Sequence, residues 1–198
     1  MSDHDLRDFI DDVAVIVKDT DDENEITRRI AARLSALLAG DYRIPAELTR
    51  PSPEHHLNYP LHIAADNSWC MVAVVWSPGQ RTPVHSHETW GVAGIYAGAE
   101  HEFRYVKPAA DGTGRPLTPA GEQVWRAGQV TVCCTTDDDV HAVESVGGEA
   151  TVGIHVYGGN IGTIRRRSYD PATGAVDWFV SGWDQSPALA GASAPRQA

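Results

Sequence analysis

The chain has 198 residues, of which 42% are apolar and 22% charged, a composition typical of one globular domain with a substantial core. Acidic residues number 27 against 16 lysines and arginines, and the formal net charge of -11 argues against a nucleic-acid-binding face or a polybasic membrane anchor. No apolar run is long enough to cross a bilayer, and three cysteines cannot form a disulfide framework. We therefore expect a cytoplasmic protein without nucleic-acid or membrane partners.

The first part of the chain, residues 1–45, has the periodicity of two helices. Apolar side chains recur there at steps of three and four residues, which places them on one stripe of each helix. Thr20 followed by Glu23 fits a capping box at the start of the second helix, and Gly40 is suited to its end. We expect both helices to pack on the outside of the domain that follows.

Residues 46–184 are expected to form the main part of the same domain, in which short β-branched and aromatic runs alternate with Gly, Pro and Asp. No long helical pattern interrupts these runs, so an antiparallel barrel or sandwich is favoured. Residues 185–198, rich in Ala, Ser and Pro, are expected to be disordered. The predicted strands span residues 69–76, 91–95, 101–105, 129–134, 141–144, 151–157 and 163–168.

Two histidines lie two residues apart in the segment that begins at Gly79. Alternate side chains of a strand share a face, so His85 and His87 can both point into a barrel. Imidazole suits divalent first-row metals, and two imidazoles from one strand form one edge of a coordination site. The best candidate for a third ligand is His141, which follows an acidic turn and opens an apolar-rich run. The sequence therefore predicts a metal site made by His85, His87 and His141.

This histidine pattern resembles the cupin superfamily. Gly79, His85 and His87, with Gly98 closing the next hairpin, are similar to the first cupin motif, and residues 128–141 are similar to the second. The resemblance implies a mainly β fold, a double-stranded β-helix or jelly-roll barrel, preceded in this chain by the two N-terminal helices.

Within the cupins, the predicted ligand set resembles that of the thiol dioxygenases. Most cupins have a glutamate ligand a few residues after the histidine pair, where this chain has Gly91 or Val92, and Glu88 would point to the opposite face of a strand. A site of three histidines without a carboxylate is similar to that of cysteine dioxygenase and bacterial 3-mercaptopropionate dioxygenase. The resemblance covers about residues 60–183 and is carried by segments 83–100, 141–145 and 153–167.

The resemblance implies a non-haem Fe(II) enzyme that oxidises a small thiol carboxylate, similar to 3-mercaptopropionate, to the sulfinate with O2. It implies that His155 orients Tyr157, whose hydroxyl serves the catalytic centre. The family spacing selects Arg166 as the group that pairs with the substrate carboxylate, a task suited to a planar guanidinium. The family relay begins with a serine two residues before the histidine, and this chain has Gly153 there.

Other interpretations of these residues remain open at the level of sequence. His155 and Tyr157 share a strand face, which fits a hydrogen-bonded core pair as well as a catalytic pair. Functional alternatives are a cysteine dioxygenase, another cupin metalloenzyme with Glu88 or Asp139 as a further ligand, and a non-catalytic cupin that binds a small acid. The sequence does not determine the preferred thiol or the oligomeric state.

Overall fold

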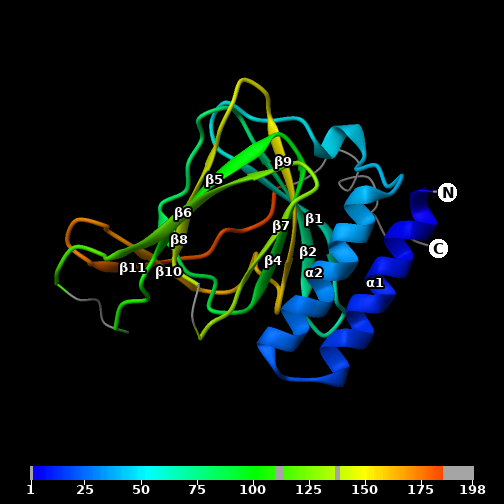
Figure 1. The fold of residues 1–198 in the computed structure, drawn as a ribbon, viewed down its shortest axis with the longest axis horizontal. Coiled ribbons are helices and arrows are strands. Elements are labelled where there is room, and N and C mark those ends of the chain that lie inside the picture. The colour runs from blue at the N-terminus through cyan, green and yellow to red at the C-terminus, as the bar shows by residue number, and fades with distance from the viewer. Residues whose placement is uncertain (1, 110–113, 137–138, 185–198) are drawn as a thin grey trace, which may run out of the picture.

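The computed structural model describes residues 2–109, 114–136 and 139–184, and it consists of two helices and two antiparallel sheets (Figure 1). The tail predicted to be disordered, residues 185–198, lies outside the described residues. Helix α1 spans Ser2–Asp19, helix α2 spans Glu23–Ala39, and a single 3-10 turn follows at Ala46–Leu48. The strands are β1 Leu57–Ile63, β2 Cys70–Trp76, β3 Val84–His85, β4 Gly91–Ala97, β5 Ala99–Tyr105, β6 Pro119–Arg126, β7 Val130–Cys133, β8 His141–Ser145, β9 Thr151–Tyr157, β10 Arg166–Tyr169 and β11 Val176–Phe179.

The strand order is that of a jelly roll. One sheet, which we call the covered sheet, has the order β1-β2-β9-β4-β7, and the other, the open sheet, has the order β11-β10-β3-β8-β5-β6. All strand pairs are antiparallel. The central strands β2 to β9 therefore form the two four-stranded orders β2-β9-β4-β7 and β3-β8-β5-β6, which is the double Greek key of a jelly roll. This confirms the predicted fold, a mainly β jelly-roll barrel with two N-terminal helices.

All seven predicted strands are present, with ends that differ from the prediction by at most three residues. Strands β1, β3, β6 and β11 were not predicted. Strands β1, β6 and β11 lie at sheet edges, and β6 is exposed along most of its length. Edge strands of this kind lack the continuous apolar run or clear alternation that marks a central strand. Strand β3 has only two residues, which is too short for a periodic pattern.

The predicted capping box at residues 20–23 is wrong. Helix α2 is capped by Asp22, whose side chain accepts the backbone N–H groups at the second and third helical positions, at 2.9 and 3.4 Å. The Glu23 carboxylate accepts hydrogen bonds from the backbone N–H and hydroxyl of Thr135 instead. A tertiary contact beyond strand β7 thus takes the side chain that the local pattern assigned to the cap.

Both helices lie on the outer face of the covered sheet (Figure 1). Ile30 and Leu34 of α2 share a buried cluster with Val92 of β4 and Ile154 of β9. The approach is close because β4 has a glycine at the contact: a Cβ on Gly94 would lie 2.8 Å from the Leu34 side chain. Strands β2 and β9 are consequently buried on both faces, which explains their nearly continuous apolar runs.

None of the helices within the described part of the chain is both long enough and apolar enough to span a membrane.

Candidate metal centre

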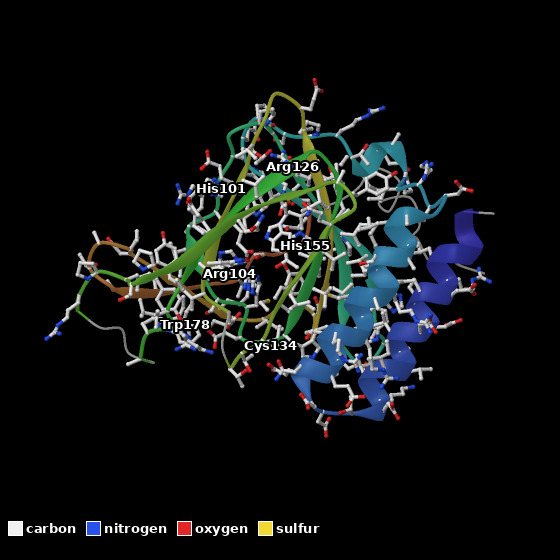
Figure 2. The ribbon with its side chains drawn as sticks, viewed as in Figure 1. His101, Arg104, Arg126, Cys134, His155 and Trp178 are labelled. Atoms are coloured by element: carbon white, nitrogen blue, oxygen red, sulfur yellow. The ribbon has the colours of Figure 1, made fainter. Side chains whose placement is uncertain are left out.

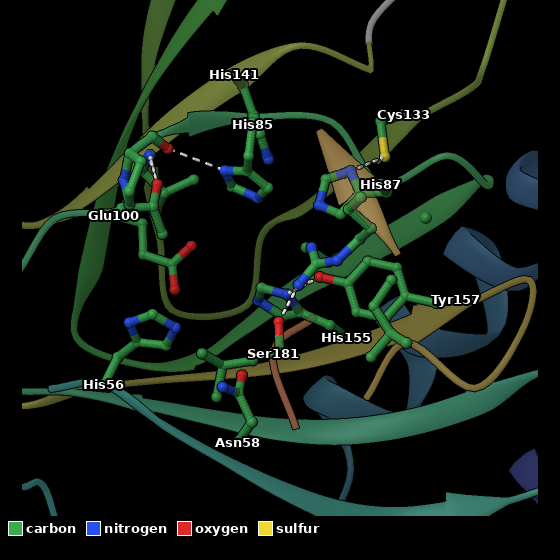
Figure 3. A pocket seen from close by; sticks show the side chains of 18 of the residues that line it. His56, Asn58, His85, His87, Glu100, Cys133, His141, His155, Tyr157 and Ser181 are labelled. Atoms are coloured by element: carbon green, nitrogen blue, oxygen red, sulfur yellow. Dashed lines mark hydrogen bonds between the residues drawn. The ribbon is translucent and has the colours of Figure 1, made fainter. Parts of the chain in front are cut away.

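The two sheets enclose a cavity of about 480 Å³ inside the barrel. Apolar side chains such as Val74 and Val143 form part of its wall, and the polar groups gather on a few strands. The predicted site residues all line this cavity: Arg166, and the residues labelled in Figure 3, His85, His87, His141, His155 and Tyr157. The fold therefore brings together residues that are up to 81 positions apart in the chain.

The three predicted metal ligands converge. His85 on β3 pairs directly with His141 on β8, and His87 follows two residues after His85. The ring centroids are 4.9 to 5.0 Å apart for all three pairs. One nitrogen atom of each ring lies within 4.8 Å of the corresponding atom of the other two, so the three rings can hold one metal ion.

The tautomer of each ring is set by a hydrogen bond at Nδ1. Each Nδ1 lies near an oxygen acceptor, so a proton on Nδ1 is donated to that oxygen and the lone pair of Nε2 is left for a metal. The acceptors are the carbonyl oxygen of Pro83 for His85 (3.0 Å), Oδ1 of Asp139 for His87 (3.1 Å) and Oε1 of Glu102 for His141 (2.7 Å).

Electrostatics favours the neutral form of His85 and His87. Burial, together with the neighbouring histidines, lowers the pKa of His85 and His87 well below the ordinary value. Burial by itself would favour protonated Glu102, but the hydrogen bond from His141 and the nearby Arg104 charge hold the pKa of Glu102 at about 2. Three imidazole nitrogens form a donor set that suits divalent first-row ions such as iron, zinc, copper or nickel, so the residues present fit a bound metal.

The two carboxylates considered as further ligands are engaged outside this cluster. Asp139 is completely buried and accepts the backbone N–H groups of His87 (2.8 Å) and Glu88 (3.3 Å) as well as the His87 ring proton. Burial raises the pKa of Asp139 to about 6, an effect that these backbone donors only partly oppose. The Glu88 carboxylate accepts two hydrogen bonds from Arg167, at 2.7 and 2.8 Å.

His155 and Tyr157 form a hydrogen-bonded pair on β9, with 2.9 Å between Nδ1 of His155 and the Tyr157 hydroxyl (Figure 3). The Tyr157 ring lies 5.1 Å from the ring of His87, centroid to centroid. Burial lowers the pKa of His155 to about 3 and raises that of Tyr157 above its ordinary value. At neutral pH the pair is therefore an uncharged imidazole and a protonated phenol beside the three histidines.

Arg166 is the one inward-facing residue of the arginine run, because β10 alternates its side chains. Its guanidinium lies 4.6 Å from the centroid of the Phe179 ring and donates to the Ser181 hydroxyl. Its Nε has no hydrogen-bond partner among the described residues, although the side chain is buried at the cavity. A buried cation with unused donors is suited to an anionic ligand. Arg165 is exposed, and its guanidinium lies over the ring of Trp178, 4.8 Å from the ring centroid. Trp178 lies on the outside of the barrel, away from the cavity that His155 lines (Figure 2).

The sequence interpretation missed several residues of the cavity. Glu100 and Glu102 face inward from β5, and their only signal was alternation in a strand of mixed polarity. Ser181 lies beyond the last predicted strand. Asp139, considered from the sequence as a further metal ligand, instead accepts hydrogen bonds from His87 and Glu88, and residues 137–138 of the same acidic turn lie outside the described residues.

The fold and the site define a jelly-roll barrel with a cluster of three imidazoles in its interior. No protein-family model matches the chain. Among solved structures, the chain is similar to a protein with a double-stranded β-helix domain from Klebsiella pneumoniae, at 16% identity and a TM-score of 0.42, over 70% of this chain and 97% of that one.

Two further similar structures are the cupin domain of Cnp3 from Schizosaccharomyces pombe and an oxalate oxidase in complex with the substrate analogue glycolate. The first has 12% identity and a TM-score of 0.44, over 61% of this chain and 69% of that one. The second has 19% identity and a TM-score of 0.43, over 61% of each chain. The fold assignment rests on the strand order of the chain itself.

Proposed function

We propose that this protein is a non-haem iron dioxygenase that oxidises a small thiol carboxylate, similar to 3-mercaptopropionate, to the corresponding sulfinate. The observation that carries the proposal is a cluster of three imidazoles that includes no carboxylate, with a phenol and a buried guanidinium in the same cavity. Both atoms of O2 end on sulfur, so a thiolate and O2 give the sulfinate without an external reductant. The proposed partners are therefore the thiol and O2.

His85, His87 and His141 would hold Fe(II) through their Nε2 atoms. The ion would supply the attraction for an anionic thiolate and the redox chemistry of O2, and neutral ligands leave its full positive charge available for this. The carboxylates of Glu102 and Asp139 hold the ligand rings by hydrogen bonds and, because they bind Nδ1, orient each Nε2 toward the cluster.

Arg166 would bind the substrate carboxylate. Its buried charge is stacked on Phe179 and only partly satisfied by Ser181, so a carboxylate that enters the cavity meets a preformed donor group. A carboxylate held there restricts where the thiol end of a short substrate can lie, which lowers the entropic cost of bringing sulfur to the three histidines.

Tyr157 would donate a hydrogen bond to the reacting groups. Its hydroxyl keeps its proton because burial raises its pKa, and His155 holds the hydroxyl in place. A Tyr157→Phe variant should therefore retain iron and substrate binding and lose about 100-fold or more in kcat, the lower range for loss of one positioned donor. Unchanged kcat would assign Tyr157 to the core.

The experiment that tests the function is O2 consumption by protein loaded anaerobically with Fe(II), with 3-mercaptopropionate, L-cysteine and cysteamine compared. The proposal expects one O2 consumed per thiol, a product heavier by two oxygen atoms in mass spectrometry, and preference for 3-mercaptopropionate. Preference for L-cysteine would favour a cysteine dioxygenase. Stoichiometric iron without oxidation of any of the three thiols would indicate another metalloenzyme, and failure to bind iron would overturn the proposal.

A further inference from the structure

Two buried polar atoms without hydrogen-bond partners among the described residues border the space beside Gly153. Among the described residues, neither Nε2 of His155 nor Oε1 of Glu100 has a partner. A Cβ on Gly153 would lie 2.6 Å from that nitrogen and 3.3 Å from that oxygen, so both atoms border the space that the glycine leaves free. Glu100 belongs to the open sheet and His155 to the covered sheet, and both line the cavity (Figure 3).

Buried polar atoms are paired in nearly all native proteins, because an unpaired group loses its bonds to water and gains nothing in return. Here one atom is a ring nitrogen that either donates or accepts, and the other is a carboxyl oxygen that does the same according to its protonation. The two are chemically complementary, and the absent side chain at Gly153 is what allows them to approach.

The direction of the hydrogen bonds follows from the state of the carboxyl group. Burial, together with the Glu102 carboxylate, raises the pKa of Glu100 to about 8, so Glu100 carries a proton at neutral pH. A protonated carboxyl donates to the lone pair of Nε2. The ring proton of His155 is then on Nδ1, where it is donated to the Tyr157 oxygen, and the Tyr157 proton is left free to point into the cavity.

We propose that Glu100 is a positioning residue for Tyr157: its carboxyl group donates a hydrogen bond to Nε2 of His155, directly or through one water molecule, and fixes the tautomer in which Nδ1–H faces the Tyr157 hydroxyl. Gly153 has no side chain that could bind Nε2 of His155. Glu100, on the opposite sheet, supplies that polar partner instead. The role in catalysis rests on the proposed function, but the hydrogen bond itself is a property of the metal-free protein.

The test is the tautomer of His155 in metal-free protein at neutral pH, measured by long-range 1H–15N correlation on 15N-histidine-labelled chain. The signal is assigned by its loss in His155→Gln. In the unsubstituted protein we expect a protonated Nδ1 and an unprotonated Nε2. Glu100→Leu should shift most of the population to the Nε2–H tautomer, whereas Glu100→Gln, whose amide also donates, should keep the original one.

The matched control is Glu144→Leu, which removes a carboxylate from the neighbouring strand β8. Glu144 lies outside the cavity and pairs with Arg81 at 3.6 Å, so this variant should leave the His155 signals unchanged. If Glu100→Leu does not fold, Gly153→Ala decides, because its Cβ occupies the space between the two atoms and should shift the tautomer as well.

A protonated Nε2 in the unsubstituted protein, or an unchanged tautomer in Glu100→Leu or Gly153→Ala, would overturn the proposal. These outcomes do not depend on oxidation of any thiol. If the dioxygenase function also holds, Glu100→Leu should lower kcat at least about fivefold with iron content and KM retained, and Glu100→Gln should restore most of the rate. If neither the unsubstituted protein nor any Glu100 variant oxidises a thiol, but Glu100→Leu still shifts the tautomer, the proposed function is contradicted and the role of Glu100 stands.

Discussion

The two sheets of the barrel differ in what lies on their outer faces and in what they contribute to the cavity. The covered sheet packs against α1 and α2, and its strands β2 and β9 are buried on both sides. The open sheet has no helix on it among the described residues, and its strands mix buried with half-exposed positions. Yet the open sheet supplies most of the polar groups of the site, namely His85, His141, Arg166, Glu100 and Glu102.

This difference teaches that stability and site chemistry are partly separated in this fold. A doubly buried strand has to be apolar on both faces, so it tolerates few polar side chains. On β9, His155 is paired with Tyr157 through Nδ1. A strand with a half-exposed outer face can alternate, which lets every second residue point a polar group into the cavity. Substitutions on the covered sheet should therefore change mainly stability, and substitutions on the open sheet mainly metal binding and activity.

The largest effect is expected from removal of a metal ligand on the open sheet. His141→Ala should weaken iron binding by more than about 100-fold, because substitution of groups that only support a ligand already costs about 10- to 100-fold. The measurement is iron per chain after anaerobic loading and desalting.

The matched control for His141→Ala is His101→Ala, on β5 of the same sheet. His101 pairs with Glu122 at 3.2 Å outside the cavity, so iron content should not change. Equal iron in both variants would remove His141 from the ligand set.

The next effect concerns the covered sheet. Leu34→Ala empties a fully buried position between α2 and β4 and should lower the free energy of unfolding by about 2–5 kcal/mol, measured by urea denaturation. Iron content of the folded variant should stay the same. Val15→Ala on the exposed side of α1 is the control and should change stability by less than about 0.5 kcal/mol. A loss of iron from folded Leu34→Ala would contradict the separation of the two sheets.

A smaller and selective effect is expected at the arginine run of β10. Arg166→Ala should lower kcat/KM for 3-mercaptopropionate by about 10- to 100-fold, the cost of one charged hydrogen-bonding group, and leave cysteamine, which has no carboxylate, little affected. Arg165→Ala is the control, because its side chain is exposed outside the barrel. Equal losses for both thiols in Arg166→Ala would assign Arg166 a structural role.

The last effect, spread over several pH units so that it is small at any one pH step, is a pH dependence of stability from Glu100. Its pKa is 4.5 for the free side chain and about 8 in the fold, so the folded state keeps a proton that the unfolded chain releases between these values. The stabilising contribution is complete below pH 4.5 and declines as the pH rises toward 8, by about 1.4 kcal/mol per pH unit.

Glu100→Gln lacks this titration, so its stability relative to the unsubstituted protein should increase with pH across that window. The measurement is the urea midpoint at several pH values. A difference between the two proteins that does not vary with pH would show that Glu100 has an ordinary pKa.

Much of the fold was predictable because the jelly roll is built from central strands with strong local patterns. The seven strands that were predicted include both doubly buried ones, whereas three of the four that were missed are edge strands, where one side makes no ladder hydrogen bonds and burial is incomplete. The prediction of the helix cap was wrong for a different reason. The Glu23 carboxylate, which the local motif assigns to the cap, accepts hydrogen bonds from the distant Thr135 instead.

The sequence by itself determined which residues could share a face: the alternation of His85 with His87, of His155 with Tyr157, and of Arg166 with its neighbours. This is a property of extended backbone and needs no knowledge of what lies opposite. Only the tertiary structure decided what stands across the cavity or behind each ring, such as His141 beside His85, Asp139 behind His87, and Glu100 opposite His155. These contacts join strands of different position in the chain, so they depend on strand order and register, which no local pattern of residues encodes.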